Sequence, residues 1–298
     1  MYLIDFLKNL VKKSNIGLSI WLILNTLLII ALFSNGFTSV EGVLLGAGLY
    51  IGSLAIALSP IGEWILRLQN GCKKITNPEH LSRLEPIFRE VYSQAKALNP
   101  ELPDNIKMFM SASNEPNAFA TGRKTVCVTQ GLLNYSDEQI KAVLGHEFGH
   151  LAHKDTDAIL VVAVGNLIVS VIFVVIRVFA NIFMCIGQFM TVVMSRSIGG
   201  IIAAFFIGLG RIFADLVLVL LMRAWTQIGV WLCMYSSRKN EFEADKYAFD
   251  CGYGEALCQV LESFGSAKGT TGLFASLASS HPQTYDRISR LRSLGNTY

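Results

Sequence analysis

The feature that most constrains this chain is a set of long stretches without any charged residue. No charged residue occurs between Ser14 and Val40, and residues Ile16 to Phe33 are almost continuously apolar. A second uncharged stretch, rich in glycine and alanine, runs from Gly42 to Gly62. A helix of about 20 apolar residues crosses the hydrocarbon core of a bilayer, and small residues favour close helix packing. These two stretches therefore predict a transmembrane hairpin near the start of the chain.

Two further apolar stretches lie in the second half of the chain. Residues Ala158 to Ile176 are uncharged, Arg177 interrupts the stretch, and Val178 to Ser195 is apolar again, which predicts a third span. A fourth span is expected within Ile201 to Trp231, near Gly200 to Met222, with its helix running on beyond the span. The composition agrees, because 52% hydrophobic and 16% charged residues are too apolar a mixture for an ordinary soluble protein.

Three charged residues fall inside the region expected to hold the fourth span. Arg211 and Asp215 are four residues apart, so they share one face of a helix and are expected to pair. Ionisable groups are unfavourable inside a membrane and are usually partnered there. A transport pathway that uses these two residues and Arg223 is the alternative, and metal analysis of the purified protein would distinguish it from a metalloenzyme.

The distribution of basic residues predicts the orientation of the first hairpin. Lysines and arginines flank the hairpin on both sides, while its tip from Ser34 to Glu41 has none. Basic residues accumulate on the cytoplasmic side, so both ends of the hairpin are expected to face the cytoplasm. A cleaved signal peptide is the alternative for the first stretch, but the apolar run exceeds the roughly 7–15 residues of a signal core. The flanking basic residues are Lys8, Lys12, Lys13, Arg67, Lys73 and Lys74.

Residues His146 to His150 read His-Glu-Phe-Gly-His and predict a metal site. Residues four apart share one face of a helix, so the two imidazoles can converge on one ion, while Glu147 can reach a water bound to it. Zinc suits such a site, because catalytic zinc takes three protein ligands and leaves one position for water. Ser136 and Gln139 form a capping box that starts the helix at about Asp137.

A soluble region lies between the two pairs of apolar stretches. Asn77-Pro78 reads as the start of an amphipathic helix that continues towards Leu98. Residues Ile106 to Met110 and Thr125 to Thr129 read as short strands. The segment near Asn117, between these strands, is expected to border the metal site. A protease needs such an exposed strand edge, because extended peptides are held mostly by main-chain hydrogen bonds.

The third metal ligand is expected in the polar segment from Ser237 to Asp245, which has helical character. Glu241 and Asp245 share one face of this helix, whereas Glu243 points elsewhere. In zinc sites a carboxylate commonly accepts a proton from a ligand imidazole and fixes its tautomer. Glu241 as the third ligand and Asp245 as the orienting carboxylate therefore form a coherent pair. A solvated, charged helix is the alternative for this segment taken by itself.

These motifs resemble those of the membrane-integrated gluzincin peptidases of the HtpX heat-shock type, which are related to the CAAX prenyl endopeptidases. Four blocks match in order, and the apolar stretches fall where this family has its spans. The resemblance implies an α-helical integral membrane protein of about four transmembrane helices with an α+β zincin-like domain. It also implies a bacterial inner membrane location. The matching blocks are Asn117 to Gly122, His146 to His150, Ser237 to Asp245, and His281-Pro282 with Arg287-Ile288.

The resemblance also implies a role for each site residue. It implies one zinc ion per chain, held by His146, His150 and Glu241, with Glu147 as the general base. Asp245 would orient a ligand from outside the coordination sphere. The remaining residues would line the site, with His281 and Tyr285 donating to the oxyanion; the full set is Asn117, His281, Tyr285 and Arg287.

The expected function is zinc-dependent hydrolysis of misfolded or damaged membrane proteins at the cytoplasmic membrane face, as part of membrane protein quality control and the stress response. The alternatives are a CAAX-type prenyl-protein endopeptidase and a catalytically idle membrane assembly factor. Expected partners are membrane or unfolded polypeptide substrates and the lipid bilayer, and no nucleic-acid patch stands out. The expected segments are a hairpin at 1–65, a first protease part at 66–157, a second hairpin at 158–236 and a second protease part at 237–298.

Overall fold

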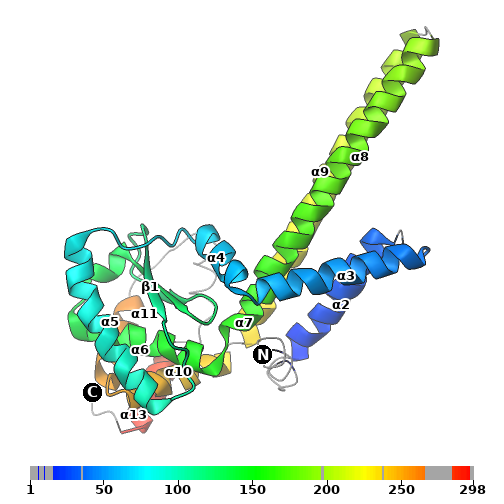
Figure 1. The fold of residues 1–298 in the computed structure, drawn as a ribbon. Coiled ribbons are helices and arrows are strands. Elements are labelled where there is room, and N and C mark those ends of the chain that lie inside the picture. The colour runs from blue at the N-terminus through cyan, green and yellow to red at the C-terminus, as the bar shows by residue number, and fades with distance from the viewer. Residues whose placement is uncertain are drawn as a thin grey trace.

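Two helical hairpins leave one side of an α/β part and diverge towards their tips (Figure 1). The structure is a computed structural model that describes residues 6, 10, 16–34, 36–195, 198–236, 238–265 and 284–295. Within these residues, four helices are long and apolar enough to cross a membrane: Ile16–Phe33, Val40–Ala57, Thr156–Met190 and Ile198–Cys233. The prediction of four apolar helices is therefore confirmed.

The first hairpin consists of α2 (Ile16–Phe33) and α3 (Val40–Ala57). The uncharged stretch that was expected to be one span up to Gly62 is divided, because α3 ends at Ala57 and α4 (Pro60–Gln69) follows. Ser59 causes this break, since its side chain caps α4 and Pro60 occupies a first helical position. The first hairpin is thus shorter than its uncharged sequence.

The second hairpin is longer than the first. Its ascending side runs from α7 (Thr156–Ile159) through a π-helical segment, η3 (Leu160–Gly165), into α8 (Asn166–Ser195). Its descending side is α9 (Ile198–Ser236), a helix of 39 residues. At 1.5 Å per residue α9 is about 58 Å long, roughly twice the thickness of a hydrocarbon core. The helix thus continues beyond Met222, where the fourth span was expected to end.

Polar side chains link the middle of the first hairpin to the lower part of the second. Asn25 donates from Nδ2 to the Tyr50 hydroxyl at 3.2 Å and to Asn166 Oδ1 at 2.9 Å. Trp225 Nε1 donates to Asn25 Oδ1 at 2.9 Å. These four residues come from α2, α3, α8 and α9, so a single buried asparagine joins all four long helices. Such hydrogen bonds hold transmembrane helices together, and the sequence analysis did not single them out.

The expected pairing of Arg211 with Asp215 is wrong. Asp215 pairs instead with Arg177 of the neighbouring helix, whose Nε donates to Asp215 Oδ1 at 2.8 Å. Asn181, also on α8, donates to the other carboxylate oxygen. Because α8 packs antiparallel against α9, both the Arg177 guanidinium and the Asn181 amide reach Asp215. Arg211, one turn away on α9, would supply a guanidinium alone.

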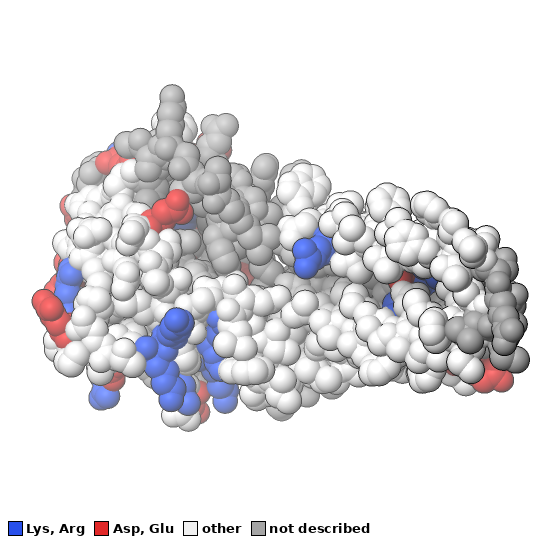
Figure 2. Space-filling view, turned by 90° about the horizontal axis from the view of Figure 1, so that it is seen from above, with Lys and Arg blue, Asp and Glu red and all other residues white. Residues whose placement is uncertain are grey.

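The surface of the hairpins is almost uncharged. In Figure 2 the hairpins form a long white region with few charged side chains, whereas Lys, Arg, Asp and Glu are spread over the α/β part. Lys and Arg also gather near the place where the two parts meet. This distribution suits a protein whose hairpins lie in lipid and whose α/β part lies in water.

The α/β part contains a sheet of three strands in the order β1-β3-β2. The strands are β1 (Lys107–Ser111), β2 (Ala118–Ala120) and β3 (Thr125–Thr129). β1 pairs with β3 in parallel, and β2 pairs with β3 antiparallel. The two strands expected from the sequence are confirmed to within one residue. The segment between them supplies β2, which forms one edge of the sheet.

Helices cover this sheet and form the core. Asn77 caps α5 and Ser136 caps α6 through a full capping box, as expected from the sequence. Phe148 of α6 is fully buried and contacts Phe88 and Tyr92 of α5, with ring centroids 5.5 and 5.7 Å away. The helices are α5 (Pro78–Leu98), η2 (Gln130–Asn134), α6 (Asp137–His153), α10 (Arg238–Asp250), α11 (Gly254–Gly265) and α13 (Thr284–Ser293).

The turn between β2 and β3 is held by residues next to the hairpins. Gly122 has φ +66°, and a Cβ at this position would lie 2.2 Å from Glu63 Cγ in α4. Glu63 Oε1 accepts a 2.9 Å hydrogen bond from the Arg123 N–H, and the Arg123 guanidinium pairs with buried Asp157 of α7. The turn after the edge strand β2 is therefore held by α4, which follows the first hairpin, and by α7, at the base of the second.

Candidate metal centre

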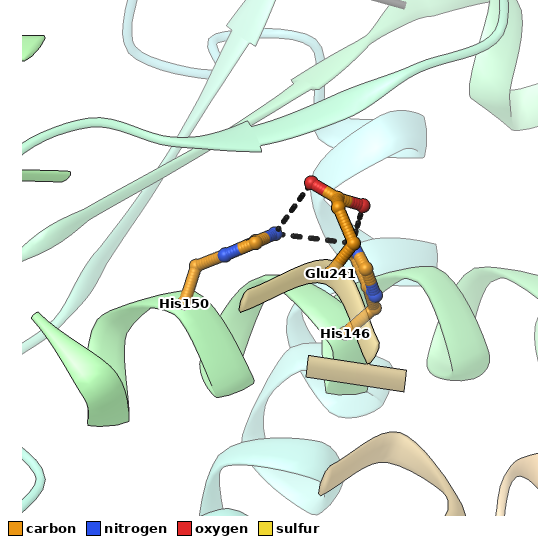
Figure 3. Close-up of side chains that lie close together, drawn as sticks. All are labelled: His146, His150 and Glu241. Atoms are coloured by element: carbon orange, nitrogen blue, oxygen red, sulfur yellow. Dashed lines mark hydrogen bonds and ion pairs between the residues drawn. The ribbon is translucent and has the colours of Figure 1, made fainter. Parts of the chain in front are cut away.

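Helix α6 presents both histidines of the motif to one point (Figure 3). Nε2 of His146 lies 3.2 Å from Nε2 of His150. Glu241 reaches the same point from α10, with Oε2 3.4 Å from His146 Nε2 and Oε1 3.5 Å from His150 Nε2. Each of the three side chains has a ligand atom within 4.8 Å of the others. These residues form a possible metal site.

The spacing of the three side chains fits zinc. Metal bonds of about 2.0–2.1 Å in a tetrahedral arrangement separate neighbouring ligand atoms by about 3.3–3.4 Å. The two histidine nitrogens lie 3.2 Å apart, and the two oxygens of Glu241 approach them at 3.4 and 3.5 Å, one oxygen to each nitrogen, so the separations are close to this value. Two imidazoles and one carboxylate are also a known donor set for catalytic zinc. The donor set and the spacing of the side chains therefore fit a zinc ion.

A glycine between the two histidines allows Glu241 to reach this point. A Cβ at Gly149 would lie only 2.8 Å from Ala244 Cα, so a side chain at that position would push α10 away from α6. Ala244 is fully buried and lies three residues after Glu241, which places the carboxylate over the histidine-bearing face. The glycine in the motif therefore sets the distance between the ligand-bearing helices.

Asp245 contacts His146, as its predicted orienting role requires. Its Oδ1 lies 2.9 Å from His146 Nδ1, and Arg287 Nε donates to its Oδ2 at 2.7 Å. Burial raises the pKa of Asp245, but the charges of Arg287 and His146 and their hydrogen bonds to the carboxylate together outweigh burial and lower it to about 2. The carboxylate is therefore ionised at any pH near neutrality. Arg287 also approaches Glu241 Oε2 at 3.5 Å, which places it beside the site, as expected.

His150 has a similar partner, Asp155, that the sequence analysis missed. Asp155 Oδ2 lies 3.1 Å from His150 Nδ1. Burial lowers the pKa of His150, but hydrogen bonds with Asp155 and Glu241 outweigh burial and raise it well above the usual value. For His146, too, burial lowers the pKa and the contacts with Asp245 and Glu241 raise it overall. Both imidazoles thus lie in a strongly negative pocket that favours a cation.

Glu147 lies beside the three possible ligands and is held by the edge strand. It is only 7% exposed, and its Oε2 accepts a 2.7 Å hydrogen bond from the N–H of Ala120 in β2. Glu147 and the edge strand β2 are therefore directly connected.

Of the other predicted site residues, the structure describes Asn117 and Tyr285. Asn117 directly precedes β2. Its carbonyl accepts from the Thr129 N–H at 2.9 Å, and its N–H donates to Thr129 Oγ1 at 2.8 Å. Tyr285 lies in the first turn of α13, two residues before Arg287, and is 78% exposed. His281 lies outside the described residues. The assigned roles of these three residues remain predictions.

Comparison with known proteins agrees with this geometry. Residues 80–295 match peptidase family M48. The chain is 31% identical over 259 residues to Protease HtpX of Ectopseudomonas mendocina, an alignment that covers 79% of this chain and 81% of the relative. It is 29% identical over 294 residues to Protease HtpX of Pseudomonas entomophila, covering 88% and 91%.

The matched region contains His146 and His150, Glu147 between them, and Glu241 of α10. The resemblance to HtpX-type proteases is thereby confirmed, and with it the expectation of an enzyme that uses a metal ion to hydrolyse peptides. The chain belongs to peptidase family M48 and is a metalloprotease.

Proposed function

We propose that this metalloprotease uses zinc to hydrolyse misfolded or damaged membrane proteins at the cytoplasmic face of a bacterial inner membrane. The observation that carries the proposal is the convergence of His146, His150 and Glu241, at separations close to those of zinc ligands, beside Glu147. When bound, zinc polarises the scissile carbonyl and lowers the pKa of a coordinated water from 15.7 to about 7. The α/β part is assigned a zincin-like fold on the same grounds.

Residues of the chain supply the remaining steps. Glu147 takes the proton from the attacking water and passes it to the leaving amine, so hydrolysis proceeds without a covalent intermediate. Asp245 and Asp155 hold the Nδ1 atoms of the histidines, so each Nε2 faces the ion. His281 and Tyr285 donate to the developing oxyanion in this proposal, as the family resemblance implies.

The edge strand β2 is the proposed binding site for the substrate backbone. Asn117 and Thr121, on either side of β2, turn their backbone groups towards β3. The Thr121 N–H donates to the Thr125 carbonyl, and the Asn117 carbonyl accepts from the Thr129 N–H. Ala118 and Ala120 consequently turn their backbone groups to the open edge, where the Ala120 N–H meets Glu147. An extended peptide that adds to this edge would place a scissile bond next to Glu147.

Variants of the proposed cleft should lower cleavage without loss of zinc. Asn117→Ala should lower kcat/KM about five-fold, the effect of losing one hydrogen bond of about 1 kcal/mol. Tyr285→Phe should lower kcat with little change in KM if the hydroxyl acts on the oxyanion. Rates measured on a peptide, with zinc content as the control, decide both cases. An unchanged rate for either variant removes that residue from the site.

Four apolar helices and uncharged hairpin surfaces support the membrane part of the proposal. We assign residues 1–65 and 158–236 to the two membrane hairpins, and 66–157 and 237–298 to the two protease parts. The metal centre lies on the α/β part. Glu147 joins it to β2, and the turn after β2 contacts α4 and α7, which adjoin the bases of the hairpins. Such a position suits substrates that emerge from the membrane surface.

The distribution of basic residues supports a cytoplasmic location for both termini and the metal site. A reporter that is active only in the cytoplasm should therefore be active when it is fused after Tyr298. A second reporter that is active only outside the cytoplasm serves as the control and should be silent there. The opposite pair of results would reverse the orientation.

The proposed function is tested by casein cleavage with detergent-solubilised protein. Cleavage should stop when a chelator removes the metal and should return when zinc is added in slight excess. Cleavage that persists in metal-free protein would contradict the proposal, as would a purified protein that contains no metal.

A further inference from the structure

The Asp155 carboxylate has two partners, one on each of the ligand-bearing helices. Its Oδ2 lies 3.1 Å from Nδ1 of His150 in α6, and these side chains are only 13% and 12% exposed. Its Oδ1 accepts a 2.8 Å hydrogen bond from Nδ2 of Asn240 in α10. Asn240 directly precedes Glu241 in the sequence. One carboxylate thus joins the helix that carries both histidines to the helix that carries the glutamate.

The end of α6 brings Asp155 to this position. In a continuous helix, a residue five positions after His150 would point about 140° away from it. Lys154 interrupts the helix with φ 60° and ψ 33°, a left-handed conformation that L-residues other than Asn and Asp seldom adopt. The Asp155 N–H then donates to the His150 carbonyl at 3.1 Å. This turn folds the Asp155 side chain back onto the imidazole.

The residues after Asp155 fix the same segment to the edge strand. Thr156 Oγ1 donates to the Gly122 carbonyl at 2.5 Å, and Asp157 accepts from Arg123 Nε at 3.0 Å. Gly122 and Arg123 belong to the turn that follows β2. The segment is therefore anchored on both sides of the carboxylate, so Asp155 reaches His150 and Asn240 with little loss of side-chain freedom.

We propose that Asp155 is a positioning residue that sets the geometry of the metal centre through His150 and Asn240. By accepting a hydrogen bond from the Nδ1–H of His150, it keeps the lone pair of the imidazole on Nε2, the atom that would bind the ion. By accepting from Asn240, it holds the start of α10 at the distance from which Glu241 coordinates. Asp245 orients His146 but takes its second partner, Arg287, from α13. Asp245 lies on α10 itself and joins it to α6 through His146, whereas Asp155 adds a second link, from the segment after α6 to the start of α10.

This inference rests on the proposed zinc site, and zinc affinity tests it separately from cleavage. We expect Asp155→Ala to weaken zinc binding about 10- to 100-fold in competition with a chromophoric chelator, the usual effect of losing such a partner. Asn240→Ala should weaken zinc binding less, because the contact with His150 remains. The double variant should match Asp155→Ala, since both changes break one bridge. Asp155→Asn keeps one acceptor and should recover part of the affinity.

Cobalt replacement gives a second measurement, because the visible spectrum of bound Co²⁺ depends on ligand geometry. The spectrum should change in Asp155→Ala and in Asn240→Ala. Asp250→Ala is the matched control, since Asp250 is an aspartate that lies on α10, as Asn240 does, but pairs with exposed Lys246. It should behave as the unmodified protein in both measurements.

The outcomes separate the inference from the proposed function. If the unmodified protein binds zinc and the Asp155 and Asn240 variants match it in affinity and cobalt spectrum, the inference fails while the proposed function stands. If the unmodified protein binds no zinc, both fail. Should Asp155→Ala not fold, an Asn240→Ala protein with unchanged affinity and spectrum would still overturn the bridge.

Discussion

Replacing Glu147 by Gln should abolish peptide hydrolysis and leave zinc in place. The amide has nearly the same shape, and its oxygen can still accept the hydrogen bond from Ala120 that now ends on Glu147 Oε2. It cannot take a proton from the attacking water, so the rate should fall by the 10²- to 10⁴-fold that general base catalysis contributes. The measurements are kcat/KM on a peptide substrate and zinc per chain.

The zinc content makes this result informative. A Glu147→Gln protein that has lost its metal would show that Glu147 belongs to the coordination sphere. A variant with full activity would remove Glu147 from the mechanism. Only retained zinc with lost hydrolysis agrees with a glutamate that acts on the water from beside the three ligands.

Replacing Glu241 by Ala should remove the metal itself. Two imidazoles would remain, and catalytic zinc is held by three protein ligands. Mutation of a residue that only contacts a metal ligand lowers metal affinity by up to roughly 100-fold. The loss of zinc affinity in Glu241→Ala should be larger, and activity should be lost with the metal. Glu243→Ala is the matched control, because residue 243 lies roughly 200° around the helix from Glu241.

The prediction for Glu241 also concerns the fold around it. Glu241 is 5% exposed, and Arg287 approaches it at 3.5 Å. Arg287 pairs more closely with Asp245, to which its Nε donates at 2.7 Å. The Asp245 contact survives in Glu241→Ala, so the variant should remain folded. Circular dichroism and the elution volume in detergent check this point before zinc is measured.

The sequence predicts features of the site that depend on local spacing. His146 and His150 lie one turn apart in a helix whose start is marked by a capping box, so their convergence follows from α-helical geometry. Glu241 and Asp245 share a face for the same reason, and the structure brings both to the histidines. The strands flanking Asn117 follow from short apolar runs between turn residues.

Features that depend on packing between distant segments were not predicted. Asp155 reaches His150 only because Lys154 adopts a left-handed conformation, and a lysine gives no sign of such a turn. Asp215 pairs with Arg177 rather than Arg211 because α8 packs against α9, a contact that spacing along one helix does not reveal. Asn25 joins four helices through partners up to 200 residues away.

The central claim is that His146, His150 and Glu241 hold zinc while Glu147 acts on the water. The most direct test measures zinc per chain and peptide cleavage side by side on the unmodified protein, Glu147→Gln, Glu241→Ala and Glu243→Ala. We expect about one zinc ion per chain in all but Glu241→Ala, and cleavage only in the unmodified protein and Glu243→Ala. If Glu243→Ala loses zinc while Glu241→Ala retains it, the assignment of the third ligand is wrong, and the orienting role of Asp245 fails with it.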